Sequence, residues 1–109
     1  MAQVIKPATL SEFNKILKKN KKPTVVMFAP STYLYRNPME ALFIKQATKY
    51  NVPFMEVETD HNKETRTRYR VTYIPAYMVI NANGYILWSI TGVGESNVNK
   101  AIDAARKQY

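Results

Sequence analysis

Apolar and polar residues in the first third of the chain predict a helix followed by a buried strand. Between Leu10 and Asn20, apolar residues recur three and four positions apart, which is the spacing of one helical face. Thr9 precedes this stripe and Glu12 follows three residues later, a pattern typical of a helix N-terminal capping box. The run "TVVMFA" at residues 24–29 is apolar throughout and rich in β-branched residues. It therefore predicts a central strand that is buried on both faces.

Helical and strand patterns alternate along the middle of the chain. Residues 38–51 predict a second helix, with Asn37 as its N-cap and a proline in its first turn, where proline is well tolerated. Residues 52–60 predict a second strand, and residues 62–71 predict a short basic helix.

The last third of the chain predicts a β-hairpin and a closing helix. Residues 75–91 form two apolar segments around Asn83-Gly84, a dipeptide typical of tight hairpin turns. Residues 95–109 predict a helix whose apolar stripe consists of Val98, Ala101, Ile102 and Ala105.

Together these segments predict a single α/β domain over residues 1–109. Their order is helix, strand, helix, strand, helix, strand, strand, helix, and residues 3–5 are a candidate for one further short strand. Strands that alternate with helices before a terminal hairpin indicate a mixed sheet. We therefore expect a sandwich with a central sheet of four or five strands, flanked by four helices.

Composition narrows the chemistry that this domain can perform. The 109 residues include no cysteine, which excludes disulfides, thiolate metal sites and thiol chemistry. His61 is the only histidine, so we expect no metal site and no cofactor. No apolar run approaches the roughly 20 residues of a membrane span, and the first residues lack the apolar region of a signal peptide. We therefore expect no membrane partner and a cytoplasmic location.

The net charge of +8 favours acidic partners, such as nucleic acid or an acidic protein surface. Two clusters are candidates for a basic patch: Lys18, Lys19, Lys21 and Lys22, and Arg66, Arg68 and Arg70. The lysines also suit the C-terminal end of a helix, so solvated charge is the simpler interpretation for them. Arg66 and Arg70 are four residues apart and would share a helical face. Direct nucleic-acid binding is therefore an alternative hypothesis.

Three stretches of the chain resemble the thioredoxin family. They are "VVMFAPST" at residues 25–32, "VETDHNKETRTRYRVTYIPAYMVI" at residues 57–80 and "NANGYILWSITGVG" at residues 81–94, and the terminal amphipathic helix agrees as well. The resemblance covers nearly the whole chain and implies a thioredoxin-like fold. It also implies that Pro75 follows a cis peptide bond.

The family's redox motif, Trp-Cys-x-x-Cys-Lys, falls on residues 31–36, where both reactive cysteines are missing. Thr32 and Tyr35 occupy the two cysteine positions, with Tyr33 and Leu34 between them. The buried acid of redox-active relatives falls on Val26. Thiol–disulfide exchange needs a thiolate that attacks a disulfide sulfur, and a hydroxyl cannot replace it. The sequence therefore excludes the family's reaction, and these replacements favour natural drift over an engineered change.

Other catalytic constellations are weak in this sequence. Ser31 or Thr32 would need His61 within hydrogen-bond reach to act as a nucleophile, and we do not expect that contact. Glu56 and Glu58 alternate along the second predicted strand, and Asp60 continues their face. Such a row could bind a cation or transfer protons, but the polar face of an edge-like strand is the favoured interpretation. We therefore expect a protein that is not an enzyme.

The leading hypothesis is a redox-inactive thioredoxin-like protein that binds a partner through its former active-site loop. In the family, the backbone before the cis proline pairs with an extended partner segment. The resemblance places this surface on Ser31, Thr32, Tyr33, Tyr35, Tyr73, Ile74, Pro75 and Gly92. Tyr35 could equally fill the space left by the second cysteine. The charge suggests a protein partner that is acidic or already bound to nucleic acid.

Two alternatives remain beside this hypothesis. The first is a basic protein that associates with nucleic acid directly, whose mark would be steep salt dependence. The second is a chain that is a thioredoxin by similarity alone, with a disulfide oxidoreductase activity that is inferred and not possessed.

Overall fold

A central strand, β1 (Thr24–Ala29), organises the molecule. The structure, a computed structural model, describes residues 4–109. Strand β1 pairs in parallel with β2 (Phe54–Glu58) and in antiparallel with β3 (Ala76–Ile80), and β4 (Ile86–Thr91) pairs in antiparallel with β3. The order β2-β1-β3-β4 is the mixed sheet expected from the sequence, with four strands.

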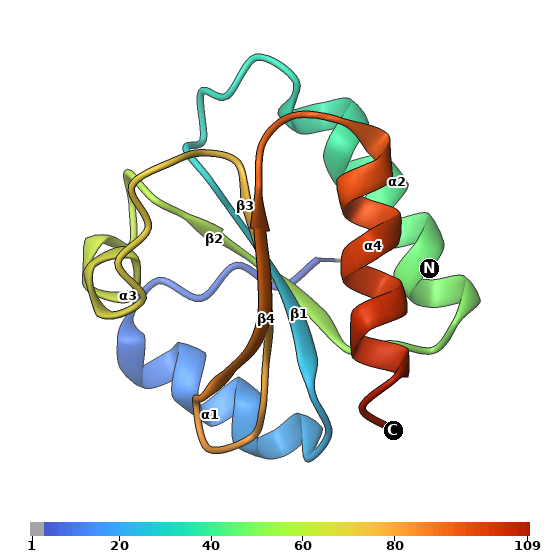
Figure 1. Ribbon diagram of the computed structural model, residues 1–109. Coiled ribbons are helices and arrows are strands. Elements are labelled where there is room, and N and C mark those ends of the chain that lie inside the picture. Colours follow the sequence, from blue (N-terminus) through green and yellow to red (C-terminus); the bar gives the residue numbers. More distant parts are fainter. Residues whose placement is uncertain (1–3) are drawn as a thin grey trace.

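Two helices cover each face of this sheet (Figure 1). The helices are α1 (Leu10–Asn20), α2 (Arg36–Lys49), α3 (Lys63–Arg68) and α4 (Glu95–Arg106). Helices α1 and α3 lie on one side of the sheet, and α2 and α4 lie on the other. Side chains alternate along β1, so Val25 and Met27 pack in the core under α2 and α4, while Val26 and Phe28 pack in the core under α1. Both faces of β1 are therefore buried, as its apolar sequence predicts.

Local hydrogen bonds at the helix and hairpin ends also follow the sequence. The Thr9 hydroxyl accepts from the Glu12 backbone N–H at 3.1 Å, and the Glu12 carboxylate accepts from the Ala8 N–H at 2.8 Å. Gly84 has a positive φ of 87°, which explains glycine in the turn between β3 and β4. The Tyr69 hydroxyl donates to the Gly84 carbonyl at 3.0 Å and ties this turn to the end of α3.

The beginning of α2 differs from the sequence prediction. Tyr35, and not Asn37, is the N-cap residue, and its side chain makes no capping hydrogen bond. The chain already turns before this point, because the Arg36 N–H donates to the Tyr33 carbonyl at 3.1 Å. Arg36 is then held in the first helical turn by ion pairs to strand β2, described below. Tertiary contacts therefore replace the local cap that Asn37 was expected to supply.

Two further predictions need correction. Helix α3 ends at Arg68, and Arg70 lies beyond it with a positive φ of 53°, so Arg66 and Arg70 do not form a helical stripe. Gln3, the start of the predicted extra strand, lies outside the described residues. Ile5 forms one isolated parallel bridge with Met55 on the outer side of β2. Over residues 4–109, no helix has the length and apolarity required to cross a membrane.

Candidate functional site

Three loops meet at one end of the sheet, where the former redox motif lies. Ala76 begins β3 and pairs with Phe28 of β1 on one side and with Thr91 of β4 on the other. The strand order therefore places the loop before β3 between the loop after β1 and the loop after β4. All three loops lie at the upper end of the sheet in Figure 1. The Gly92 N–H donates to the Pro75 carbonyl at 2.9 Å and joins two of these loops.

The loop after β1 is anchored to the end of β2 by one carboxylate. Asp60 accepts from the Ser31 backbone N–H at 2.8 Å and from the Ser31 hydroxyl at 2.5 Å. The Thr59 N–H also donates to the Ala29 carbonyl at 3.1 Å. The hydrogen bonds from Ser31 lower the pKa of Asp60 to about 2. This carboxylate is therefore a fixed acceptor that orients the loop.

Ser31, Asp60 and His61 lie close together but do not form a nucleophilic triad. The His61 Nε2 atom is 3.6 Å from Asp60 Oδ2, the same oxygen that accepts from the Ser31 hydroxyl. The carboxylate therefore lies between the hydroxyl and the imidazole, whereas a triad needs the imidazole beside the hydroxyl. A carboxyl group with a pKa of about 2 is also a poor base near neutral pH. His61 is exposed.

Five large apolar side chains are exposed on these three loops, and we call them the loop-end patch. They are Leu34 (82% exposed), Tyr35 (50%), Tyr73 (74%), Ile74 (42%) and Val93 (58%). Single exposed apolar residues are common on protein surfaces, whereas a group of them marks an interaction site. Leu34 was named as a position of the motif and Val93 was not predicted, because the exposure of an apolar residue in a loop cannot be inferred from the sequence.

The two tyrosines of the former redox motif take different positions. Tyr33 packs against the core under α2 and α4 with its hydroxyl buried, whereas half of Tyr35 is exposed. Their rings meet edge to face with centroids 6.0 Å apart. Burial, together with the nearby Tyr35, raises the pKa of Tyr33. Tyr33 therefore supports the loop from below, and Tyr35 presents its ring to solvent.

The backbone before Pro75 is available for pairing. The Ile74–Pro75 peptide bond is cis, and the Pro75 ring is buried. Across residues 4–109, no hydrogen bond uses the N–H or the carbonyl of Ile74. Thr32 is exposed in the neighbouring loop, and Ser31 and Gly92 are half-buried. The site thus offers an unpaired backbone segment between exposed apolar side chains.

A charged cluster lies beneath the former redox motif, centred on Arg36. The Arg36 Nε atom is 2.9 Å from Glu56 Oε1, and Nη2 is 3.1 Å from Glu58 Oε2 and 3.3 Å from Glu40 Oε2. Lys6 lies 3.5 Å from the same Glu40 oxygen. The Glu56 side chain is completely buried. The cluster connects the first turn of α2 to strand β2.

The pKa values of two carboxyl groups in this cluster shift in opposite directions. Burial and a hydrogen bond to Glu40 raise the pKa of Glu56 to about 8. Burial also acts on Glu40, but the hydrogen bond from Glu56 and the charges of Lys6 and Arg36 outweigh it and lower the pKa of Glu40. A neutral Glu56 can donate to Glu40 from one oxygen while the other oxygen accepts from Arg36. With one proton on Glu56, the charges of the other two carboxylates balance the charges of the two cations, Lys6 and Arg36.

Glu56 was expected on the polar face of an edge-like strand; β2 is an edge strand, but the Glu56 side chain is completely buried. Glu56 and Glu58 do share a face of β2, since both contact Arg36, but α2 covers that face. Arg36, at the lysine position of the motif, was not predicted to pair with these carboxyl groups. The sequence signal for such a buried ion pair is a glutamate that apolar residues flank on a strand. The second part of the signal is an arginine in the segment that follows the neighbouring strand.

The candidate basic residues are spread over several surfaces. Lys18 and Arg68 line a hollow of about 220 Å³ beside the hairpin turn. Arg66 uses its Nε–H to donate to the Val71 carbonyl at 3.1 Å, and Lys22 donates to the Asn51 carbonyl at 3.2 Å. Some of these cations therefore have structural roles. In the described part of the chain, no three His, Cys, Asp or Glu side chains are grouped to hold a metal ion.

Comparison with known proteins agrees with this architecture. The family model described as Thioredoxin matches residues 4–104. Among solved structures, the reduced thioredoxin pre-protein of Schistosoma mansoni has a TM-score of 0.83 at 23% identity, covering 95% of this chain and 99% of that one. Thioredoxin from Fasciola hepatica has a TM-score of 0.82 at 22% identity, with coverages of 92% and 97%. Thioredoxin from Trypanosoma brucei brucei has a TM-score of 0.80 at 22% identity, with coverages of 96% and 89%. No curated protein matches the sequence.

Proposed function

Because this chain belongs to the thioredoxin family and contains no cysteine, we propose that it is a redox-inactive module that binds a partner protein through the loop-end patch. The observation that carries the proposal is the patch itself. Five large apolar side chains are exposed on three loops at one end of the sheet, around the unpaired backbone of Ile74. An extended segment of a partner can pair with that backbone and place its side chains on the patch.

The support beneath the patch favours a binding role. Asp60 fixes the loop after β1 through two hydrogen bonds, and the Gly92 N–H fixes the Pro75 carbonyl. Arg36 holds the start of α2 through three carboxyl groups. A surface that is rigid before binding loses less conformational entropy when the partner arrives. With a net charge of +8, the chain favours an acidic partner.

The experiment is capture of partners by the tagged chain from its native host's lysate, with and without nuclease, at low and high salt. The test variant is Leu34→Ala/Tyr73→Ala, and Tyr109→Ala is the control, since it removes a half-exposed tyrosine at the opposite end of the sheet. Loss of an exposed interface anchor costs about 1–2 kcal/mol, which is roughly tenfold in affinity for each residue. We expect the test variant to lose a captured protein that the wild-type chain and the control retain, while its thermal unfolding stays unchanged.

Two results would contradict the proposal. Equal capture by the test variant and the control would show that the binding surface lies outside the loop-end patch. Capture that disappears with nuclease would favour direct nucleic-acid binding, for which the hollow lined by Lys18 and Arg68 is the starting point.

A further inference from the structure

The two outer edges of the sheet differ in how much of their backbone is paired. On the outer side of β2, the Ile5 carbonyl accepts from the Glu56 N–H at 3.0 Å, so part of that edge is paired. At the opposite edge, no segment within residues 4–109 pairs with the outer side of β4. Proteins usually protect such an edge with charged residues or proline. Strand β4, "ILWSIT", has neither, so its free backbone groups are open to another strand.

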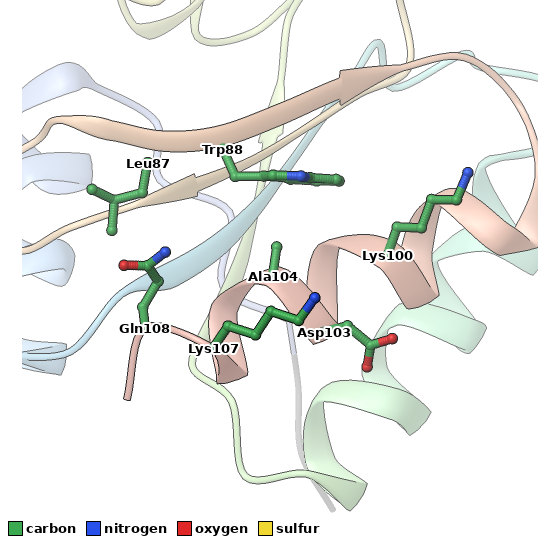
Figure 2. Close-up of a pocket in the computed structure, with 7 residues that line it drawn as sticks. All are labelled: Leu87, Trp88, Lys100, Asp103, Ala104, Lys107 and Gln108. Carbon is green, nitrogen blue, oxygen red and sulfur yellow. The ribbon is translucent and has the colours of Figure 1, made fainter.

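A β-bulge shapes the surface beside this open edge. Ile80 pairs with Ile86 while Val79 pairs with Trp88, so Leu87 is an extra residue on β4. Leu87 and Trp88 both line a groove of about 330 Å³ between β4 and the C-terminal half of α4. In Figure 2 the Trp88 ring lies over Ala104, and the Leu87 side chain faces Gln108. The edge is therefore bordered by a groove with an apolar floor.

Cations border this groove. Lys100 of α4 and Lys107, the residue directly after that helix, line it, and they are seven residues apart, which is about 10 Å along a helix. Asp103 is the acidic residue of the lining, and its carboxylate points away from the Trp88 ring in Figure 2. Asp103 also lies 3.8 Å from Arg106. The groove therefore suits a ligand that combines an apolar side chain with negative charge.

We propose that β4 accepts an extended acidic peptide segment of a partner protein as a fifth strand. Side chains two residues apart lie on the same face of a strand, and residues four apart are about 13 Å apart. An apolar residue at the centre would enter the groove beside Leu87 and Trp88. Acidic residues two positions before it and two positions after it would share its face and supply negative charge for Lys100 and Lys107. The segment therefore has the pattern acidic-x-apolar-x-acidic.

Charge favours this occupant over a second copy of the chain. Pairing of two β4 edges would bring two copies of α4 near each other, each with Lys100 and Lys107 at the groove. The whole chain also carries a net charge of +8, so two copies repel each other. An acidic segment instead neutralises both lysines.

Trp88 supplies a direct readout, because it is the only tryptophan in the chain. The probe is a synthetic peptide with Glu-Thr-Leu-Thr-Glu at its centre, titrated into the protein while tryptophan fluorescence is followed. We expect a saturable blue shift with the acidic peptide and none with its Lys-Thr-Leu-Thr-Lys counterpart. N-methylation of alternate amides in the acidic peptide should abolish the shift, because it removes the hydrogen bonds that a strand donates.

Charge reversal tests the two lysines. Lys100→Glu/Lys107→Glu should weaken binding of the acidic peptide by roughly tenfold or more at low salt, since two attractive pairs become repulsive. Lys15→Glu/Lys45→Glu is the matched control, because it makes the same change of net charge on exposed residues of α1 and α2. Leu34→Ala/Tyr73→Ala should bind the peptide normally, which separates this surface from the loop-end patch.

Several outcomes would overturn the proposal. They are equal shifts with acidic and basic peptides, no shift at all, unchanged binding after N-methylation, or equal weakening by both charge-reversal variants. Sedimentation at the same concentrations tests the second-copy alternative. If the chain dimerises and Lys100→Glu/Lys107→Glu changes that equilibrium while the control does not, the occupant of the edge is a second copy.

Discussion

At the scale of single residues, Glu56 couples folding to pH. Its pKa of about 8 in the folded chain lies above the ordinary value of 4.5, so the folded state retains a proton that the unfolded state releases. The free energy of unfolding should therefore fall as the pH rises from about 4.5 to 8, by no more than about 1.4 kcal/mol per pH unit for one group. Glu40 acts in the opposite direction below this range, because its pKa is lowered.

Glu56→Gln is expected to flatten this dependence. Glutamine keeps an oxygen that accepts from Arg36 and offers an amide that donates to Glu40, so it imitates the neutral carboxyl group. Urea unfolding at a series of pH values should show a smaller slope between pH 5 and 8 and a more stable variant at pH 8. Glu64→Gln, on the exposed side of α3, controls for loss of one carboxylate. Parallel curves for wild type and Glu56→Gln would show that Glu56 is ionised throughout.

A second residue-scale prediction concerns the loop anchor at Asp60. The lowered pKa of Asp60, about 2, is caused by the two hydrogen bonds from Ser31. Ser31→Ala removes the hydroxyl donor and keeps the backbone donor, so the pKa of Asp60 should rise toward its ordinary value of 3.8. A carboxyl NMR titration measures this directly. An unchanged pKa in Ser31→Ala would mean that the hydroxyl does not hold the carboxylate in solution.

At the scale of elements, the cap of α1 is the simplest part of the fold to test. The Thr9 hydroxyl accepts from the Glu12 N–H at the start of the helix. Thr9→Ala should lower the free energy of unfolding by about 1 kcal/mol, while Thr9→Ser should be nearly neutral because it keeps the oxygen. Chemical denaturation of the three proteins makes the comparison. Equal losses for Ala and Ser would indicate that packing of the methyl group, and not the cap, is responsible.

Elements were predictable where a local pattern determines them. The apolar run of β1, the Asn83-Gly84 turn and the stripe of α4 depend on residues within one segment, and the structure has each of them. The start of α2 was not predictable in this way, because Arg36 is fixed by Glu56, twenty positions away in the sequence. The bulge at Leu87 likewise depends on its pairing with β3. Local patterns contain no information about such contacts between segments.

The candidate site was predictable to a similar extent. The resemblance assigned the former redox motif and the loop before Pro75 to one surface, and the structure has both at the same end of the sheet. It could not separate Tyr33, which supports the loop, from Tyr35, which is exposed, because both have the same side chain. Orientation of a loop side chain is decided by the space that the core leaves for it.

At the scale of the whole molecule, the net charge of +8 opposes compaction. At an ionic strength of 0.01 M the Debye length is about 30 Å, so charges across the whole molecule repel one another. Added salt screens this repulsion, and the urea midpoint should therefore be higher in 0.5 M sodium chloride than at 0.01 M. Lys15→Glu/Lys45→Glu reduces the net charge from +8 to +4, since each substitution removes two units. Its midpoint should respond less to salt. An equal response in both proteins would exclude self-repulsion as the cause.

The bridge between Ile5 and Met55 also decides how far assembly can proceed. A sheet with two open edges can polymerise, because each added strand leaves a new edge at which the next molecule attaches. Here Ile5 occupies the middle of the edge at β2, so β4 is the side left for growth. If two copies paired through β4, each would then present only the β2 edge, part of which Ile5 already occupies, so strand pairing between copies would end at two. The segment around Ile5 thereby limits growth of the sheet from copy to copy.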